Sequence, residues 1–289
     1  MDPRIEQFVV LFLGIFYEAV PFLTIGALVS AGIHLFVDPH WLLQRLPQHP
    51  VAAAVCGGLI GVLFPVCECG SVPAARSVLG RGAPREFGYA FALAAPVINP
   101  IVLVSTSVAF VGVTGWGFVF WRIGLTLLVA VLTARALPAP VVNPQPVAHP
   151  HDDTLPLLAW LRHAGADWVD MLRFLVFGAA VAAAVQIYLP TAWFLSLAEQ
   201  PLLAVPAMIG LAALMSICST VDAFVGLALL RTVPPAAVMA FLVFGPMVDL
   251  KSIPMFVGAF GWPVTLRIVG RTAGLTTVAC VAAGWFGWL

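Results

Sequence analysis

The chain has 289 residues, of which 62% are hydrophobic and only 9% are charged, and its formal net charge is zero. A soluble domain is about 45–50% apolar and about 25% charged, so this composition excludes an ordinary soluble protein and indicates a polytopic membrane protein. Because the chain has no excess of basic residues, we do not expect nucleic acid as a partner. The expected partner is the lipid bilayer. Five cysteines, an odd number within apolar segments, do not indicate a disulfide framework.

Eight apolar stretches are candidates for membrane spans, because a helix needs about 20 residues to cross the hydrocarbon core. They run over residues 6–36, 51–79, 86–111, 115–137, 167–189, 201–230, 235–258 and 262–288. The sequence therefore predicts an all-α polytopic membrane protein with about eight transmembrane helices.

A polar segment rich in proline, histidine and aspartate divides these spans into two groups of four. The predicted organisation is a first transmembrane repeat over residues 1–137, a cytoplasmic linker over residues 138–166 and a second repeat over residues 167–289. The turn after the second span holds Arg81 and Arg85, and Arg135 and Arg162 lie just before and within the linker, whereas the turns after the third and seventh spans hold no Lys or Arg. This favours the linker and both termini in the cytoplasm. Arg45, in a loop that this arrangement places outside, disagrees.

The two halves share landmarks in the same order. Cys67 matches Cys218, and Asn99 matches Asp249. Four crossings per half is an even number, so the repeats would be parallel. A re-entrant hairpin in place of the second span would change the parity and make the repeats inverted.

Proline and glycine interrupt the second and third spans of each half. A continuous helix over residues 51–79 would be about 43 Å long, against a hydrocarbon core of about 30 Å. We therefore expect broken helices near the bilayer midplane, with a non-helical stretch over residues 67–71. The residues expected at the breaks are Pro65, Gly70, Pro73, Pro96, Pro100 and Pro246. Broken helices with polar residues at the break point to the binding site of a transporter.

Three stretches, residues 64–70, 95–100 and 241–251, resemble the bacterial predicted-permease family that includes the ArsP-type organoarsenical efflux permeases. Residues 218–224 also fit the family pattern of a cysteine followed by Asp-Ala-Phe. The resemblance runs from about Phe8 to the C-terminus, with the linker unmatched. It implies eight spans, an inner-membrane location and, in the ArsP-type members, export of trivalent methylated or aromatic arsenicals.

Sulfur ligands at the breaks suit a thiophilic solute, because thiolates prefer soft ions and a trivalent arsenical bonds to two or three of them. The candidate substrate-binding residues are Cys67, Cys69, Cys218, Asn99 and Thr220. Three sulfurs would converge if the breaks of the two halves face each other. Cys56 and Cys280 are single cysteines on apolar helices and are interpreted as packing residues.

Charged residues near the breaks are candidates for proton coupling or for structural charge: Glu68, Asp222, Asp249 and Lys251. A charge at mid-membrane costs about 2.5–3.5 kcal/mol on insertion scales, so each needs a reason. A carboxylate in such a place can carry a proton, which makes proton antiport the most economical coupling. The arginines of the spans, Arg76, Arg122, Arg267 and Arg271, are interpreted as reaching the headgroups.

The sequence thus predicts a multi-pass inner-membrane permease, not an enzyme, that uses no cofactor and exports a thiophilic solute such as a trivalent arsenical. No metal site is firmly assigned. The protein could form a homo-oligomer, and the sequence does not decide its oligomeric state. One alternative is a permease for a metal ion or for a sulfur or selenium compound. Another is a membrane thiol redox protein, which is disfavoured because redox motifs usually place two residues between their cysteines, and only Glu68 stands between Cys67 and Cys69.

Overall fold

The computed structural model describes residues 3–36, 46–64, 66–139, 156–189, 191–198, 200 and 203–287. Every regular element in these ranges is helical, which confirms the all-α class. Helices long and apolar enough to cross a membrane run over Arg4–Gly32, Arg85–Thr114, Gly117–Ala136, Leu157–Tyr188 and Trp262–Trp285. Together with the shorter apolar helices among the described residues, they make the chain a polytopic membrane protein.

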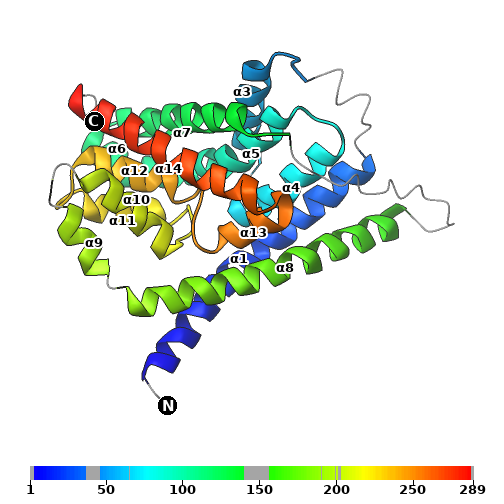
Figure 1. Ribbon diagram of the computed structural model, residues 1–289, viewed down its shortest axis with the longest axis horizontal. Coiled ribbons are helices and arrows are strands. Elements are labelled where there is room, and N and C mark those ends of the chain that lie inside the picture. Colours follow the sequence, from blue (N-terminus) through cyan, green and yellow to red (C-terminus); the bar gives the residue numbers. More distant parts are fainter. Residues whose placement is uncertain are drawn as a thin grey trace.

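The order of elements is similar in the two halves (Figure 1). The first half contains α1 (Pro3–Phe36), α3 (Pro50–Ile60), the 3-10 turn η1 (Gly61–Leu63), α4 (Glu68–Gly80), α5 (Arg85–Ile98), α6 (Pro100–Thr114) and α7 (Gly117–Ala136). The second half contains α8 (Pro156–Tyr188), α9 (Thr191–Ala198), α10 (Ala204–Met215), α11 (Asp222–Leu229), α12 (Pro235–Phe244), α13 (Ser252–Phe260) and α14 (Trp262–Trp285). Apart from α9, each half has a long helix, two pairs of short helices and another long helix.

The first pair of short helices, α3 and α4, folds back on itself. Both arms pack against α5, and Ala53 in the first turns of α3 lies in one apolar cluster with Val78 near the end of α4 and Phe87 at the start of α5. The arms have 11 and 13 residues, about 17 and 20 Å, so neither spans a core of about 30 Å. The stretch predicted as one span over residues 51–79 is therefore a re-entrant hairpin.

The second pair, α5 and α6, forms one crossing that bends at Asn99. Helix α7 runs antiparallel to both members of the pair. Phe110 of α6 stacks on Phe118 at the start of α7, with ring centroids 4.3 Å apart. The Tyr89 hydroxyl of α5 donates to the carbonyl of Pro138, directly after α7. The end of α6 thus lies at the start of α7, and the start of α5 lies near the end of α7. Helices α5 and α6 therefore run in the same direction.

In the second half, α10 and α11 both pack against α12. A side chain at Gly226 of α11 would meet Leu242 of α12, and Ala212 near the end of α10 lies against Gly245 at the end of α12. Helices α10 and α12 thus run parallel and α11 returns antiparallel, which makes α10 and α11 a second hairpin. Helices α12 and α13 both pack against α14. The described crossings are therefore α1, α5–α6, α7, α8, α12–α13 and α14.

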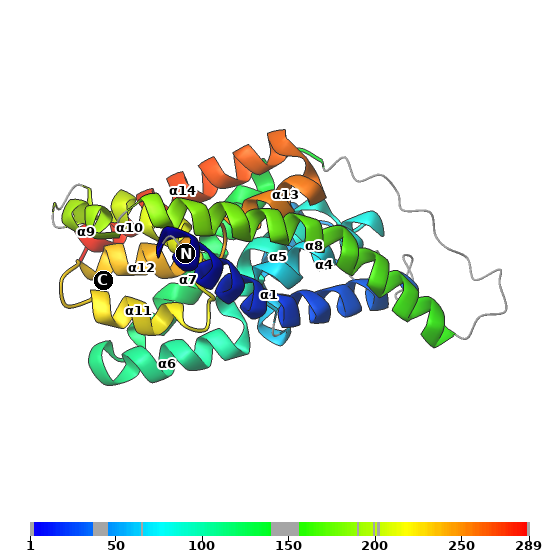
Figure 2. The same cartoon turned by 90° about the horizontal axis from the view of Figure 1, so that it is seen from below.

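Because the hairpins do not cross the membrane, the loops that lie at each face differ from those predicted for eight crossings. Arg76 of α4, Pro138 after α7 and Gly261 between α13 and α14 line one cavity and so lie at the same face. At the opposite face, Gly284 near the end of α14 approaches Ala236 at the start of α12. Figure 2 shows α9, α11 and the C-terminus on the left and the start of α8 on the right. The sequence predicts the linker and both termini at one face, and the described ends of α7 and α14, at Pro138 and Gly284, lie at opposite faces.

Two glycines let the long helices approach the short ones. A Cβ at Gly26 of α1 would lie 2.4 Å from the Cα of Gly70 in α4. A Cβ at Gly178 of α8 would lie 2.4 Å from the carbonyl oxygen of Lys251 at the start of α13. Such close backbone contacts are typical of small residues at interfaces between membrane helices. They fix α1 against the first hairpin and α8 against the second broken crossing.

Candidate functional site

The non-helical stretches of each half meet through side chains. They comprise residues 64, 66 and 67 and residues 216–221 at the hairpin tips, and Asn99 and residues 245–251 in the broken crossings. Asn99 Nδ2 donates to the carbonyl of Val66 at 3.2 Å. Lys251 Nζ donates to the carbonyl of Ser216 at 2.9 Å. Each hairpin tip is thus tied to the broken crossing of its own half, and backbone carbonyls that no helix satisfies find a donor.

The predicted break residues fare differently. Pro100 begins α6, and Pro246 lies in the second broken crossing. The placement of the first tip over residues 67–71 is wrong, because α4 already begins at Glu68. Gly70 and Pro73 lie inside α4, and Pro96 lies inside α5. A proline this near a helix start removes only one backbone bond, so the helix tolerates Pro73. Pro65 lies outside the described residues.

Asn99 and Asp249 have the same local geometry. Asn99 Oδ1 accepts from the Val102 amide at 2.9 Å, and Asp249 Oδ1 accepts from the Ser252 amide at 2.8 Å. Each side chain satisfies an amide in the first turn of the following helix, as an N-cap does. The sequence match of these two residues therefore corresponds to two caps, one at α6 and one at α13.

Cys67 and Cys218 also match in geometry. The Cys67 carbonyl accepts from the amides three and four residues ahead, and the Cys218 carbonyl does the same. The resulting turn begins the returning arm of each hairpin. The acidic residue does not match, because Glu68 directly follows its cysteine and Asp222 lies four residues beyond its own.

Lys251 lies between two carboxylates that the sequence also singled out. Its Nζ is 2.8 Å from Glu68 Oε1 and 3.2 Å from Asp249 Oδ2, and all three side chains are buried. One ammonium and two carboxylates leave one negative charge. Glu68 Oε2 and Asp249 Oδ2 accept no hydrogen bond from the described residues. A buried charge without compensation is costly, so this cluster has room for one more positive charge.

Asp222 is neutralised by Arg122 of α7. Arg122 Nη2 donates to Asp222 Oδ2 at 2.6 Å, and Nη1 donates to Oδ1 at 3.3 Å and to Thr106 Oγ1 at 2.7 Å. This is a bidentate pair with both side chains buried. The interpretation of Arg122 as a headgroup contact is wrong, since its side chain has no exposed surface. Its partner is 100 residues away in sequence, and no local pattern reveals it.

The two ion pairs are reciprocal between the halves. Glu68 begins the returning arm of the first hairpin and pairs with Lys251 of the second half. Asp222 begins the returning arm of the second hairpin and pairs with Arg122 of the first half. Helix packing follows the same exchange, because α4 contacts α13 and α11 contacts α6. Each hairpin therefore depends on the opposite half for its counter-ion.

The candidate thiols are buried near these charges. Cys67 and Cys69 are both buried and flank Glu68 at the start of α4. Cys218 accepts a hydrogen bond from Thr220 Oγ1 at 3.4 Å. Among the described residues no group of three or more His, Cys, Asp or Glu is arranged to hold a metal ion. The described geometry thus offers a thiol pair at the first tip and a third thiol at the second.

Comparisons with known proteins agree with a transport role. A family model with the description "Predicted permease" matches residues 4–285. The UPF0718 protein YcgR of Bacillus subtilis is 38% identical over 259 residues, which cover 86% of this chain and 87% of that protein. A putative two-component membrane permease complex subunit of Streptococcus mutans is 36% identical over 295 residues, covering 98% and 97%.

A shorter match, to the UPF0718 protein YraQ of Escherichia coli, is 28% identical over 131 residues and covers 45% of this chain and 35% of that protein. No solved structure matches the chain. Since the family model covers nearly the whole sequence, including both hairpins and both broken crossings, this chain belongs to the predicted permease family.

Proposed function

We propose that this permease exports a thiophilic small solute across the bacterial inner membrane, with a trivalent organoarsenical as the best candidate. The observation that carries the proposal is the buried pair Cys67 and Cys69 at the first hairpin tip. Soft sulfur ligands inside a membrane protein favour a soft, thiophilic partner. Their position at a break between helices is where a transporter places its cargo.

Two neighbouring thiols suit a trivalent arsenical with one organic group. Such a compound, R–As(OH)2, condenses with two thiols: two As–S bonds form, two As–O bonds break and two water molecules leave. No oxidant or reductant is needed. Cys218 with Thr220 would contribute from the second tip when the halves move. Asn99 is engaged in capping α6 and in holding Val66, so its proposed role is to position the tip.

We further propose that the coupling proton occupies the cluster of Glu68, Asp249 and Lys251. The proposal is supported by the net charge of the cluster, because one ammonium and two carboxylates leave one buried negative charge. Binding of one proton would neutralise the cluster, and its loss would recharge it, as a proton antiporter requires. Asp222 is assigned a structural role instead, because Arg122 neutralises it through two hydrogen bonds.

The topology suggests that the halves are inverted repeats. Three crossings and one hairpin per half is an odd count, which relates two copies by an axis in the membrane plane. The face of the linker carries most of the arginines near connections: Arg76, Arg81, Arg85, Arg135, Arg162 and Arg267. Arg45 lies in sequence between α1 and α3, which both meet that face. The positive-inside rule then assigns the linker to the cytoplasm and both termini to the outside.

Reporter fusions test this orientation. A green fluorescent protein inserted between residues 140 and 155 is expected to fluoresce, and alkaline phosphatase fused after Leu289 is expected to be active, because phosphatase folds only outside the cytoplasm. The matched control is a fluorescent protein in the turn at Gly82, at the same face as the linker. A fluorescent C-terminal fusion together with an active phosphatase in the linker would reverse the orientation.

Cysteine substitution tests the cargo. Cys67→Ser and Cys69→Ser each keep the size of the side chain but remove the soft ligand, so uptake of methylarsenite or phenylarsenite by everted vesicles should fall to near background. Cys56→Ser and Cys280→Ser serve as controls and should transport normally. Full transport by both tip variants would refute a thiophilic cargo. Uptake of a panel of metal ions, sulfur and selenium compounds would then identify another solute.

One relative suggests a partner. The Streptococcus mutans protein is named as a subunit of a two-component permease complex. We propose that this chain likewise works with a second membrane subunit, in preference to a homo-oligomer. Proteoliposomes that contain the purified chain alone should then transport more slowly than everted vesicles from its native host.

A further inference from the structure

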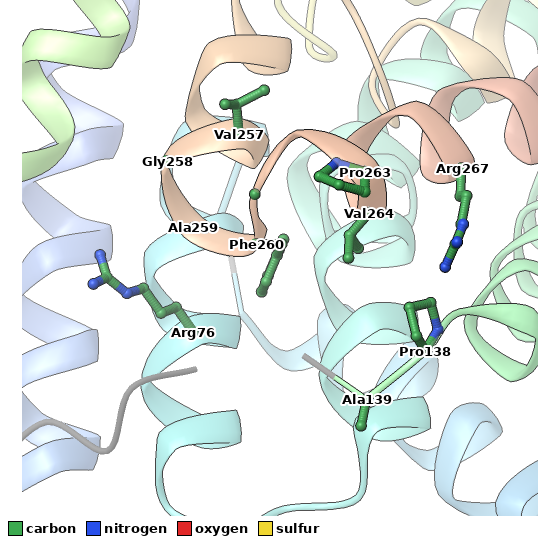
Figure 3. A pocket seen from close by; sticks show the side chains of 11 residues that line it. Arg76, Pro138, Ala139, Val257, Gly258, Ala259, Phe260, Pro263, Val264 and Arg267 are labelled. Carbon is green, nitrogen blue, oxygen red and sulfur yellow. The ribbon is translucent and has the colours of Figure 1, made fainter. Parts of the chain in front are cut away.

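A cavity lies at the face where α7 ends, and its lining residue Arg76 is seven residues, about 10 Å, along α4 from Cys69. It has a volume of about 530 Å³ and opens between the halves. Its walls come from α4, from the residues directly after α7 and from the turn between α13 and α14 (Figure 3). Val257, the lining residue of α13 nearest to Lys251 in sequence, lies six residues beyond it, about 9 Å along the helix. The cavity is therefore distinct from the proposed transport site.

The charges that line this cavity are all positive. Arg76 and Arg267 are its charged lining residues, and no acidic residue lines it. Arg76 pairs with Asp170, which is shared with Arg173, so this trio keeps one positive charge. Arg267 is exposed and forms no ion pair with any residue that the structure describes. Its side chain points toward Pro138 in Figure 3. The cavity thus offers an unneutralised guanidinium to a ligand.

The remaining wall is apolar and well supported. Val257, Phe260 and Val264 contribute to it. Tyr89 packs edge-on against Phe260, with ring centroids 5.2 Å apart, and its hydroxyl donates to the Pro138 carbonyl. Tyr89 therefore holds the start of the linker against the end of α13. An apolar wall beside a cationic rim, at a membrane face, matches a ligand with a negative head and an apolar body.

We propose that this cavity binds the phosphate group of an anionic amphiphile, with a phospholipid headgroup as its source in preference to free phosphate. Guanidinium groups bind phosphate oxygens through paired hydrogen bonds. Basic pockets between membrane helices at the cytoplasmic face take anionic headgroups. A ligand in this place would contact both halves and the start of the linker, so it would tie the two halves together at that face.

Native mass spectrometry of the full chain in a neutral detergent tests the site. Phosphatidylglycerol, phosphatidylcholine and inorganic phosphate are titrated separately. The wild-type protein should retain phosphatidylglycerol in preference to phosphatidylcholine. Arg267→Gln should weaken phosphatidylglycerol binding about fivefold, the effect of one arginine at a membrane surface. Arg271→Gln, one turn along α14 and outside the cavity lining, should not.

The arms of the experiment separate the two sources. If the wild type binds inorganic phosphate and Arg267→Gln loses that binding, the cavity is an anion site, but its ligand is free phosphate and not a lipid headgroup. Equal binding of both lipids, or equal loss in both variants, would overturn the proposal. Arg267→Lys keeps the charge but not the paired hydrogen bonds, so it should bind phosphatidylglycerol more tightly than Arg267→Gln and less tightly than the wild type, which distinguishes lost recognition from a damaged fold. Cysteine variants of the transport site should bind the lipid normally.

Discussion

Replacement of Lys251 by methionine is expected to destabilise the protein by about 3–5 kcal/mol, because it leaves Glu68 and Asp249 as buried carboxylates without a counter-ion. The Lys251 ammonium also donates to the Ser216 carbonyl, so the second hairpin tip loses its donor. Thermal unfolding in detergent should show a clearly lowered midpoint, and vesicles that contain the variant should not transport.

Two further variants separate charge from packing at Lys251. The double variant Lys251→Met with Glu68→Gln restores the charge balance and should recover much of the lost stability, although not transport. Asp249→Asn keeps the Oδ1 atom that caps α13 and removes one carboxylate. It should therefore fold and bind the solute but lose transport driven by a pH gradient. Wild-type stability of Lys251→Met would mean that the cluster does not hold the charges assigned to it.

The class of the protein and the candidate residues of its site follow from local sequence. The long apolar stretches alone indicate membrane helices, and the cysteines and the prolines near them indicate interruptions. The match of Asn99 to Asp249 could be read without a structure, because both residues occur in the same place relative to a proline-bounded stretch. The structure adds the reason, which is that both side chains cap the next helix.

The direction of the short helices could not be predicted. Residues 51–79 are long enough for one crossing. Whether they fold back into a hairpin depends on tertiary packing around Ala53, Val78 and Phe87, which the local sequence does not reveal. The sequence also misplaces the exact tip, for a related reason. Pro73 suggested a break, but α4 begins at Glu68, and this places the proline close enough to the helix start to be tolerated.

The ionic partners were equally hidden. Glu68 and Lys251 are 183 positions apart, and their pairing needs α4 to pack against α13. Glu68, Asp222 and Lys251 were recognised as unusual because charges in apolar segments are expensive. Arg122 has the same cost, but arginines near span ends commonly reach the headgroups, which is why its buried position was missed. Only the burial of the side chain in the structure distinguishes an arginine in a buried ion pair from one that reaches the headgroups.

Arg122→Met is the second variant with a large expected effect, because it leaves Asp222 buried at the start of α11 and removes the donor to Thr106. We expect a loss of about 3–5 kcal/mol in the free energy of unfolding. Arg122→Met combined with Asp222→Asn should be markedly more stable than Arg122→Met alone, and Arg271→Met, on an exposed turn of α14, should unfold like the wild type. If the double variant also regains transport, the pair holds the second hairpin in place and carries no proton. If it folds but stays inactive while Glu68→Gln remains active, the coupling site belongs at Asp222, and the assignment to the Lys251 cluster fails.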